Sequence, residues 1–112
     1  MVVAPDAGDL VWVNFTPQSG REQAGKRPAL VLTPRLYNEK VGLMVACPIT
    51  SKSKNYPFEV PLPAGLAIVG FVLSDHLKSM DWRARGAEVA GAASKDVLAE
   101  VRGKLGTLLQ IP

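Results

Sequence analysis

The chain has 112 residues, of which 47% are apolar and 21% charged, so it has enough apolar material for one hydrophobic core. This length argues against a two-domain enzyme with a cleft between its domains, and we expect a single domain over residues 1–112. Thirteen Lys and Arg residues against ten Asp and Glu residues give a net charge of +3, which permits a polyanionic partner. One cysteine and one histidine exclude a disulfide framework, a Cys/His zinc site and a catalytic histidine pair.

The sequence gives no sign of export or membrane insertion. The N-terminal segment lacks the basic and apolar regions of a signal peptide, and the longest nearly apolar run, Ala64–Leu73, is about half a membrane span. The unpaired Cys47 fits a reducing compartment. We therefore expect a cytoplasmic protein that does not enter a membrane.

In chain order, the pattern predicts seven short strands followed by one helix. The strands are rich in β-branched and aromatic residues, and their spacing of roughly ten residues favours a small barrel or sandwich. Ser94 is a suitable N-cap for the helix, whose apolar residues recur at helical spacing from Val97 to Leu109. Proline at position 61 places its strand at a sheet edge. The expected strands are Leu10–Phe15, Pro28–Thr33, Leu43–Ile49 with its end at Pro48, Phe58–Leu62, Ile68–Leu73, Lys78–Trp82 and Glu88–Ala90.

Two polar loops concentrate the positive charge, with seven Lys and Arg residues against two Glu residues between positions 20 and 54. In the first loop, Arg27 stands beside Pro28 at a strand start, where a planar guanidinium could bind a phosphate through two hydrogen bonds. The second, Pro48–Lys54, alternates hydroxyl groups and lysines, a combination that suits phosphate oxygens. Taken alone, each loop is equally compatible with a solvated surface turn.

Other chemistry-bearing residues have ordinary explanations. Cys47 lies within a predicted strand and is expected to be a small buried apolar group, and His76 a surface or strand-end residue. The sequence contains no P-loop, GxGxxG, HExxH or GxSxG signature. Several aromatic residues could stack on bases, although each also fits core packing: Trp12, Trp82, Tyr37, Tyr56 and Phe58.

Five segments follow one another in a familiar order: Gly8–Phe15, Glu22–Ala29, Pro48–Thr50, Tyr56–Val60 and Trp82–Gly86. Together they resemble the motifs of the MazF/PemK family of toxin endoribonucleases, and they look closest to its MazF branch. The Glu-Gln-x-Gly-x-Arg-Pro run that begins at Glu22 is the most specific of these motifs. The resemblance covers the chain from Gly8 to the C-terminal helix without a large insertion.

The resemblance implies a mainly β (α+β) fold, an SH3-like small barrel with a C-terminal α-helix, that forms a homodimer. It implies the toxin of a type II toxin–antitoxin system that cuts single-stranded RNA without a metal ion or other cofactor. A cognate MazE-like antitoxin would cover the RNA site with an extended tail. In the family, an arginine and a threonine at the positions of Arg27 and Thr50 serve the cut. Glu22 and Gln23 match the loop that flanks the site and contacts RNA.

The available side chains restrict the mechanism to attack by the ribose 2′-hydroxyl, which leaves a 2′,3′-cyclic phosphate and a 5′-hydroxyl end. The permanently charged guanidinium of Arg27 is a poor base, so we assign it to stabilising the charge of the phosphorane. Thr50 would hydrogen-bond a phosphoryl oxygen, and Glu22 is a candidate base. The predicted RNA-binding residues are Gln23, Lys26, Ser51, Lys52, Lys54, Tyr56, Asp75, His76 and Lys78, and no residue is assigned to a metal.

Two positions depart from the family pattern, which commonly has Asp-Gln where this chain has Asp75-His76 and an acid where it has Asn14. We expect these changes to affect base preference more than cleavage, so an ACA-like triplet is only one candidate target. Two alternatives stay open: a CcdB-like gyrase poison on the same barrel, and a catalytically silent RNA- or protein-binding SH3-like module. The gyrase poisons share a C-terminal Trp-Gly-Ile, whereas this chain ends at Leu109–Pro112 without it.

Overall fold

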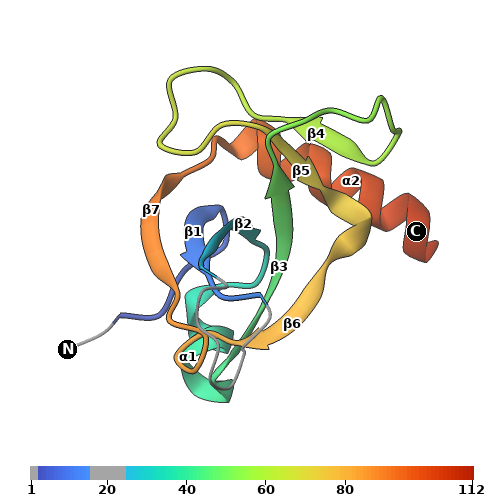
Figure 1. Ribbon diagram of the computed structural model, residues 1–112. Helices are drawn as coiled ribbons and strands as arrows, with labels where there is room; N and C mark the ends of the chain where they lie inside the picture. Colours follow the sequence, from blue (N-terminus) through green and yellow to red (C-terminus); the bar gives the residue numbers. More distant parts are fainter. Residues whose placement is uncertain (1–2, 16–24) are drawn as a thin grey trace.

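The computed structural model describes residues 3–15 and 25–112 (Figure 1). Within these residues the chain forms seven strands, two α-helices and a short 3-10 helix. The helices are α1 (Arg35–Val41), the 3-10 helix η2 (Ser74–His76) and α2 (Lys95–Leu109). The strands are β1 (Asp9–Val13), β2 (Arg27–Val31), β3 (Leu43–Thr50), β4 (Glu59–Pro61), β5 (Phe71–Leu73), β6 (Lys78–Asp81) and β7 (Glu88–Ala92).

The strands pair antiparallel in the order β4-β5-β3-β2-β1-β7, and β6 pairs with β3 beside this path. The long strand β3 carries two partners on one edge, since β6 pairs with residues 43–46 and β5 with residues 49–50. The sheet therefore bends around β3 and curls around a common interior, with α2 beside β4 and β5 (Figure 1). This antiparallel barrel with a C-terminal helix confirms the predicted fold class.

Strands β1, β2 and β3 are buried on both faces. Because fully burying one Val or Leu side chain contributes about 1.5–3 kcal/mol, two clusters hold these strands firmly in place. The cluster on the α2 side contains Leu10, Leu30, Cys47, Ile49, Val60, Ile68, Val72, Val97, Val101 and Leu105. The cluster on the other side contains Ala4, Val11, Val13, Ala29, Val31, Met44, Ala46, Met80 and Trp82.

Helix α2 begins as the sequence predicts. The Ser94 hydroxyl oxygen accepts a hydrogen bond of 3.3 Å from the backbone N–H of Val97, which is the N-cap contact. Val97, Val101 and Leu105 recur every four residues and form its buried face. Among the described residues, no helix is long and apolar enough to cross a membrane.

Helix α1 was not predicted, because its apolar residues Leu36, Tyr37 and Val41 stay exposed and form no buried stripe. The helix is held instead by the fully buried Asn38. Its side-chain amide nitrogen donates hydrogen bonds of 2.9 Å to the carbonyl oxygens of Pro5 and Thr33. Side-chain hydrogen bonds to carbonyl groups outside the helix therefore stabilise α1, one of them 33 positions away, and helical periodicity does not reveal them.

The predicted strand end at Pro48 is wrong, since β3 continues to Thr50. The amide and carbonyl groups of Val45 both face the β2 side. The Val45 N–H donates a hydrogen bond of 2.9 Å to the Thr33 hydroxyl oxygen, and the Val45 carbonyl oxygen accepts one of 2.8 Å from the N–H of Leu32. The nitrogen of Pro48, three residues further on, consequently faces away from β2. Pro48 lies between Ala46, the last residue paired with β6, and Ile49, the first residue paired with β5. A missing N–H at this position breaks no hydrogen bond of either ladder. Proline 61 lies on the edge strand β4, as predicted.

Candidate active site

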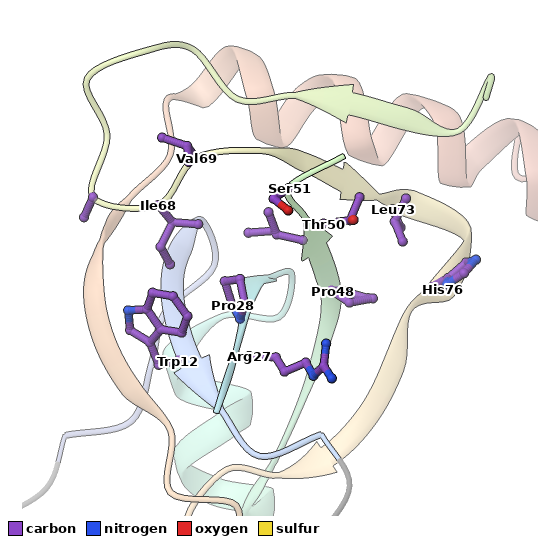
Figure 2. A pocket seen from close by; sticks show the side chains of 12 residues that line it. Trp12, Arg27, Pro28, Pro48, Thr50, Ser51, Ile68, Val69, Leu73 and His76 are labelled. Carbon is purple, nitrogen blue, oxygen red and sulfur yellow. The ribbon is translucent and has the colours of Figure 1, made fainter. Parts of the chain in front are cut away.

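A pocket of about 630 Å³ opens where the ends of β1, β2 and β3 meet η2 and the segment 67–69 (Figure 2). This volume lies in the range of small-ligand sites. Ile49 and Ile68 of the cluster on the α2 side line it, so the pocket is built on the packed core of the barrel. Its lining residues are Trp12, Arg27, Pro28, Pro48, Ile49, Thr50, Ser51, Ala67, Ile68, Val69, Leu73 and His76.

Arg27 and Thr50, the two residues predicted to serve the cut, lie on neighbouring strands of this pocket. The β2–β3 ladder ends at the pair Ala29–Pro48, and Arg27 and Thr50 each lie two residues beyond this pair, at the same end of the ladder. Side chains two residues apart on a strand project from the same face, so Arg27 follows the face of Ala29 and Thr50 the face of Pro48. Figure 2 shows both side chains at the pocket. The structure therefore brings together two residues that are 23 positions apart in the sequence.

The Arg27 side chain is exposed and, among residues 3–15 and 25–112, makes no hydrogen bond or ion pair. Within this part of the chain its guanidinium is available for two parallel hydrogen bonds to a phosphate. The Thr50 hydroxyl oxygen lies 3.4 Å from the backbone nitrogen of Lys52, from which it accepts, so its own O–H is left to donate. A cation beside a neutral donor suits two oxygens of one phosphate group.

An apolar wall faces these polar groups. Trp12 pairs with Pro28 across β1 and β2, and its side chain borders the pocket with 38% of the residue exposed. Val69 is exposed on the segment above it, while Ile68 turns into the core. An exposed indole face beside a cationic site is the kind of platform on which a nucleobase stacks.

Ser51 lines the pocket directly after Thr50, and the exposed Lys52 and Lys54 continue the same loop. This loop ends in contacts to Glu59, the first residue of β4. Glu59 is only 9% exposed and accepts hydrogen bonds from the Ser53 hydroxyl and the Lys54 backbone N–H. Two of the predicted RNA-binding lysines therefore stand at the rim of the pocket on a tethered loop.

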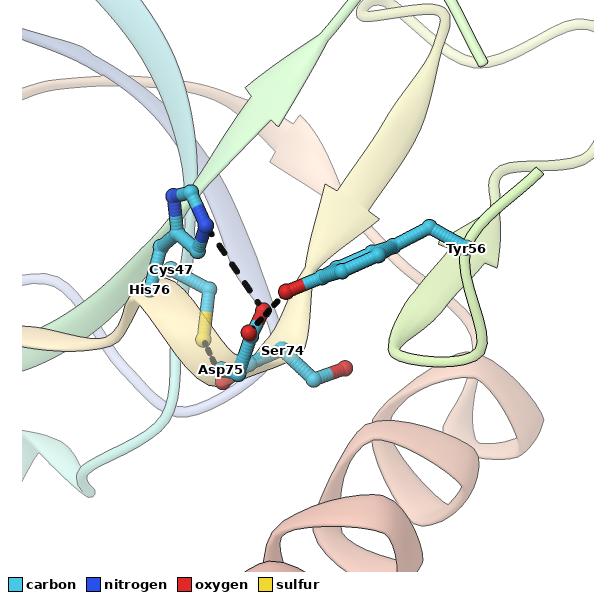
Figure 3. Close-up of polar contacts among 5 residues, drawn as sticks. All are labelled: Cys47, Tyr56, Ser74, Asp75 and His76. Atoms are coloured by element: carbon cyan, nitrogen blue, oxygen red, sulfur yellow. Dashed lines mark hydrogen bonds and ion pairs between the residues drawn. The ribbon is translucent and has the colours of Figure 1, made fainter. Parts of the chain in front are cut away.

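Tyr56, Asp75 and His76 form a second polar group (Figure 3). The Tyr56 hydroxyl donates a hydrogen bond to Asp75 Oδ2, while His76 Nε2 lies 3.8 Å from Asp75 Oδ1. The pKa of Tyr56 is raised. This hydrogen bond is the largest cause, followed by burial and by the negative charges of Asp75 and Glu59. Of these three residues only His76 lines the pocket. The contacts place Asp75 between a phenol donor and the pocket-lining imidazole.

Cys47 is buried beneath this group. Its sulfur lies 3.5 Å from the carbonyl oxygen of Ser74, to which the thiol donates. Burial, together with the negative charge of Asp75, raises the pKa of the Cys47 thiol to about 12. The thiol stays protonated at neutral pH and is a poor nucleophile. The prediction that Cys47 is a small buried group is confirmed.

Lys26 and Lys78 also lie outside the pocket lining, as do the predicted RNA-binding residues Lys52, Lys54, Tyr56 and Asp75. Lys26 Nζ donates a hydrogen bond of 2.7 Å to the carbonyl oxygen of Gly86 and lies 3.2 Å from Glu88 Oε1. Lys78 Nζ lies 5.9 Å from the centre of the Phe15 ring. Both lysines therefore have partners within the protein.

The predicted roles of Glu22 and Gln23 lie outside the described residues and stay predictions. Among the residues that the structure describes, no group of three or more His, Cys, Asp or Glu side chains is placed to hold a metal ion. The ionisable side chains of the described pocket lining are Arg27 and His76, one a cation and the other a group that becomes a cation on protonation. The arrangement favours an anionic ligand.

The sequence named Trp12 only as one of five aromatic residues that could stack on bases, and it gave no role to the segment 67–69 or to the Glu59 contacts. A tryptophan inside a strand with apolar neighbours is equally consistent with a core residue. Its place at the pocket becomes clear only from its pairing with Pro28. A signal for Glu59 was available, because an acid on a short strand flanked by valine and phenylalanine needs buried donors.

The family model of PemK-like, MazF-like toxins of type II toxin–antitoxin systems matches residues 6–109. The Endoribonuclease toxin MazF of Escherichia coli K12 is 48% identical to this chain over 105 residues, which cover 94% of both proteins. The Endoribonuclease PemK of Escherichia coli is 32% identical over 108 residues, which cover 93% of this chain and 81% of PemK. These matches do not favour the two alternatives, a gyrase poison and a silent binding module.

Solved structures agree with this assignment. A chain in the crystal structure of MazE–MazF from Deinococcus radiodurans is 63% identical and superposes with a TM-score of 0.91, covering 97% of this chain and 98% of its own length. A crystal structure of MazF from the same organism is 64% identical with a TM-score of 0.87, covering 96% of this chain and 98% of its own length. The barrel, its pocket and these likenesses lead to one conclusion: the chain belongs to the family of PemK-like, MazF-like toxins of type II toxin–antitoxin systems.

Proposed function

We propose that this chain, an endoribonuclease toxin, cuts single-stranded RNA at the Arg27–Thr50 pocket without a metal ion. The observation that carries the proposal is that Arg27 and Thr50 line one pocket, with the Arg27 side chain free of partners among the described residues. The scissile phosphate would lie between the guanidinium and the threonine hydroxyl. Both groups would then donate to its nonbridging oxygens.

The reaction needs no external nucleophile. The ribose 2′-oxygen attacks the phosphorus atom, and the bond from phosphorus to the 5′-oxygen of the next nucleotide breaks. The products are a 2′,3′-cyclic phosphate and a 5′-hydroxyl end. A base removes the 2′-hydroxyl proton, a role for which Glu22 is the sequence-based candidate, and the leaving 5′-oxygen gains a proton. Arg27 stabilises the charge that develops on the phosphorane.

Recognition of the RNA sequence would come from the groups around the phosphate. Trp12 offers an indole face to a base, and Ser51 and His76 offer hydrogen-bonding groups from two sides of the pocket. Lys52 and Lys54 would hold phosphates beside the cut. Tyr56 and Asp75 would act through His76, and Lys26 and Lys78 would contribute positive charge further away.

The partners follow from the same family membership. A matching structure from Deinococcus radiodurans is described as MazE–MazF, and we infer that a cognate MazE-like antitoxin binds this chain. We also infer a homodimer, because Leu108, Leu109 and Ile111 at the end of α2 leave more than two fifths of their surface exposed. A toxin that cuts mRNA would act in the cytoplasm as a single domain over residues 1–112.

The test is cleavage of a long single-stranded RNA, followed by mass spectrometry of the new ends. We expect 2′,3′-cyclic phosphate and 5′-hydroxyl ends, and no cutting of an oligonucleotide with a 2′-deoxyribose at the mapped position. Arg27→Ala should lower the single-turnover rate by about 100- to 1,000-fold, the usual loss for one transition-state donor. The matched control is Arg102→Ala, which removes an exposed arginine of α2 outside this pocket. Cleavage of the deoxy substrate, or a normal rate for Arg27→Ala, would contradict the mechanism.

A further inference from the structure

Glu59 is the one buried carboxylate among the described residues. It is the first residue of the edge strand β4, and both of its oxygens accept hydrogen bonds from the loop that follows Thr50. The Ser53 hydroxyl donates to Oε1 at 2.8 Å, and the backbone N–H of Lys54 donates to Oε2 at 2.6 Å. Buried charges persist only where such donors satisfy them, so these two contacts are strong ones.

The contacts fix the whole segment 51–55, whose residues are all exposed. At the start of the segment, the N–H of Lys52 donates to the Thr50 hydroxyl oxygen. At its end, the N–H of Asn55 donates a hydrogen bond of 3.0 Å to the Ser53 hydroxyl oxygen. Asn55 has a φ of +52°, a left-handed conformation that an unrestrained loop would seldom hold. Among the described residues, Glu59 is the group that ties this segment to the body of the barrel.

A carboxylate bound to the N–H of Lys54, on the loop that follows the pocket residue Ser51, opposes the binding of RNA by charge alone. Its two strong contacts to that loop indicate another role. We propose that Glu59 is a positioning residue, which holds the segment 51–55 so that Ser51, Lys52 and Lys54 face the RNA beside the scissile phosphate. This inference rests on the proposed endoribonuclease activity and deepens it. Glu59 itself is buried and does not contact the substrate.

Charge and position predict opposite effects of the same substitution. Glu59→Gln removes a negative charge near a polyanion site, and an electrostatic effect alone would tighten RNA binding. If Glu59 positions the loop, the substitution releases two lysines from the RNA path and weakens binding. The transition-state groups Arg27 and Thr50 lie on β2 and β3 and do not touch Glu59, so the turnover rate should be retained.

The experiment compares kcat, KM and the salt dependence of RNA binding for the wild type, Glu59→Gln, Ser53→Ala and the double variant. We expect Glu59→Gln to raise KM about tenfold, with kcat within about twofold of the wild type. The slope of log K against log salt should flatten by about 1.4, which corresponds to two phosphates on a single strand. The double variant should be no worse than Glu59→Gln alone, because both substitutions break one network. Glu100→Gln, which removes an exposed acid from α2, should match the wild type.

A lower or unchanged KM for Glu59→Gln, or a loss confined to kcat, would overturn the proposal. If Glu59→Gln does not fold, as judged by its thermal melting, Ser53→Ala carries the test, since it alters one exposed side chain. It should raise KM about threefold and flatten the salt slope, and a normal KM for Ser53→Ala overturns the inference. A wild-type protein that cuts no RNA would remove the proposed function together with this role, whereas normal cleavage by both variants removes only the role of Glu59.

Discussion

Replacing Gly70 with alanine is expected to impair cleavage although Gly70 contributes no side chain to the pocket. Its φ of +130° belongs to a backbone conformation that residues with side chains rarely adopt. Its carbonyl oxygen accepts a hydrogen bond of 2.9 Å from the backbone N–H of Leu62, which ties the start of β5 to the end of β4. A methyl group at position 70 would overlap the carbonyl oxygen of Thr50 and lie 3.0 Å from its carbonyl carbon.

The size of the effect follows from this overlap. Carbon atoms in contact normally lie about 3.5–4.0 Å apart, so the end of β3 must move by at least about 0.5 Å. A misplacement of about 1 Å in a catalytic site can lower the rate about 100-fold, and we therefore expect a 10- to 100-fold loss in kcat. The strained φ adds about 1–3 kcal/mol of destabilisation.

Gly65→Ala is the matched control for the strain. Gly65 lies in the same connection between β4 and β5 and also has a positive φ, +94°, but an added methyl group meets no described atom within 4 Å. It should lower the free energy of unfolding and leave the rate unchanged. The assay is single-turnover cleavage at saturating RNA, with urea unfolding of both variants. Equal rates for Gly70→Ala and Gly65→Ala would show that Gly70 does not hold Thr50 in place.

Three further outcomes are expected. Thr50→Val keeps the side-chain volume but removes a neutral donor, so the single-turnover rate should fall about tenfold, less than for Arg27→Ala, and a normal rate would make the hydroxyl structural. EDTA should leave cleavage unchanged, because the described residues offer no cluster of metal ligands, and a loss of activity would contradict the metal-free mechanism. The pKa of Cys47 is raised from 9.0 to about 12 in the folded protein, so between these values only the unfolded chain releases the proton. Urea titrations of the wild type should then show the free energy of unfolding fall by about 1.4 kcal/mol per pH unit above pH 9. Cys47→Ala should lack this decrease. The same dependence of the free energy of unfolding on pH in both proteins would refute the burial argument.

The strands could be predicted because their signals are local. Alternating β-branched residues bounded by Gly, Pro and Asp mark β1 and β2 within a few residues, and Pro61 correctly marks an edge strand. The N-cap at Ser94 was equally local. Helix α1 was missed because Asn38, a residue without helical preference, holds it through hydrogen bonds to the carbonyl groups of Pro5 and Thr33, which lie outside the helix.

The site was predicted in part for the same reason. Arg27 and Thr50 belong to motifs that are specific in sequence, and both line the pocket at the end of the β2–β3 ladder. The apolar wall depends on how Trp12 meets Pro28, and the close approach of Gly70 to Thr50 depends on how two strands far apart in sequence cross. Neither contact has a pattern along the chain, because each is set by packing between elements and not within one.

Glu59 and Asp75, two described carboxylates, have partners within the protein and do not line the pocket. Glu59 is occupied by the Ser53 hydroxyl and a backbone N–H, and Asp75 by the Tyr56 hydroxyl. An acid left free at the rim would repel a phosphate and would compete with it for Arg27. Glu59 orders the segment 51–55 through its two donors. Asp75 stands behind His76 with its Oδ2 bonded to Tyr56, and neither acid forms a described ion pair to Arg27. The barrel thus uses its acids for internal contacts and leaves a cation, hydroxyl groups and an indole face for the RNA.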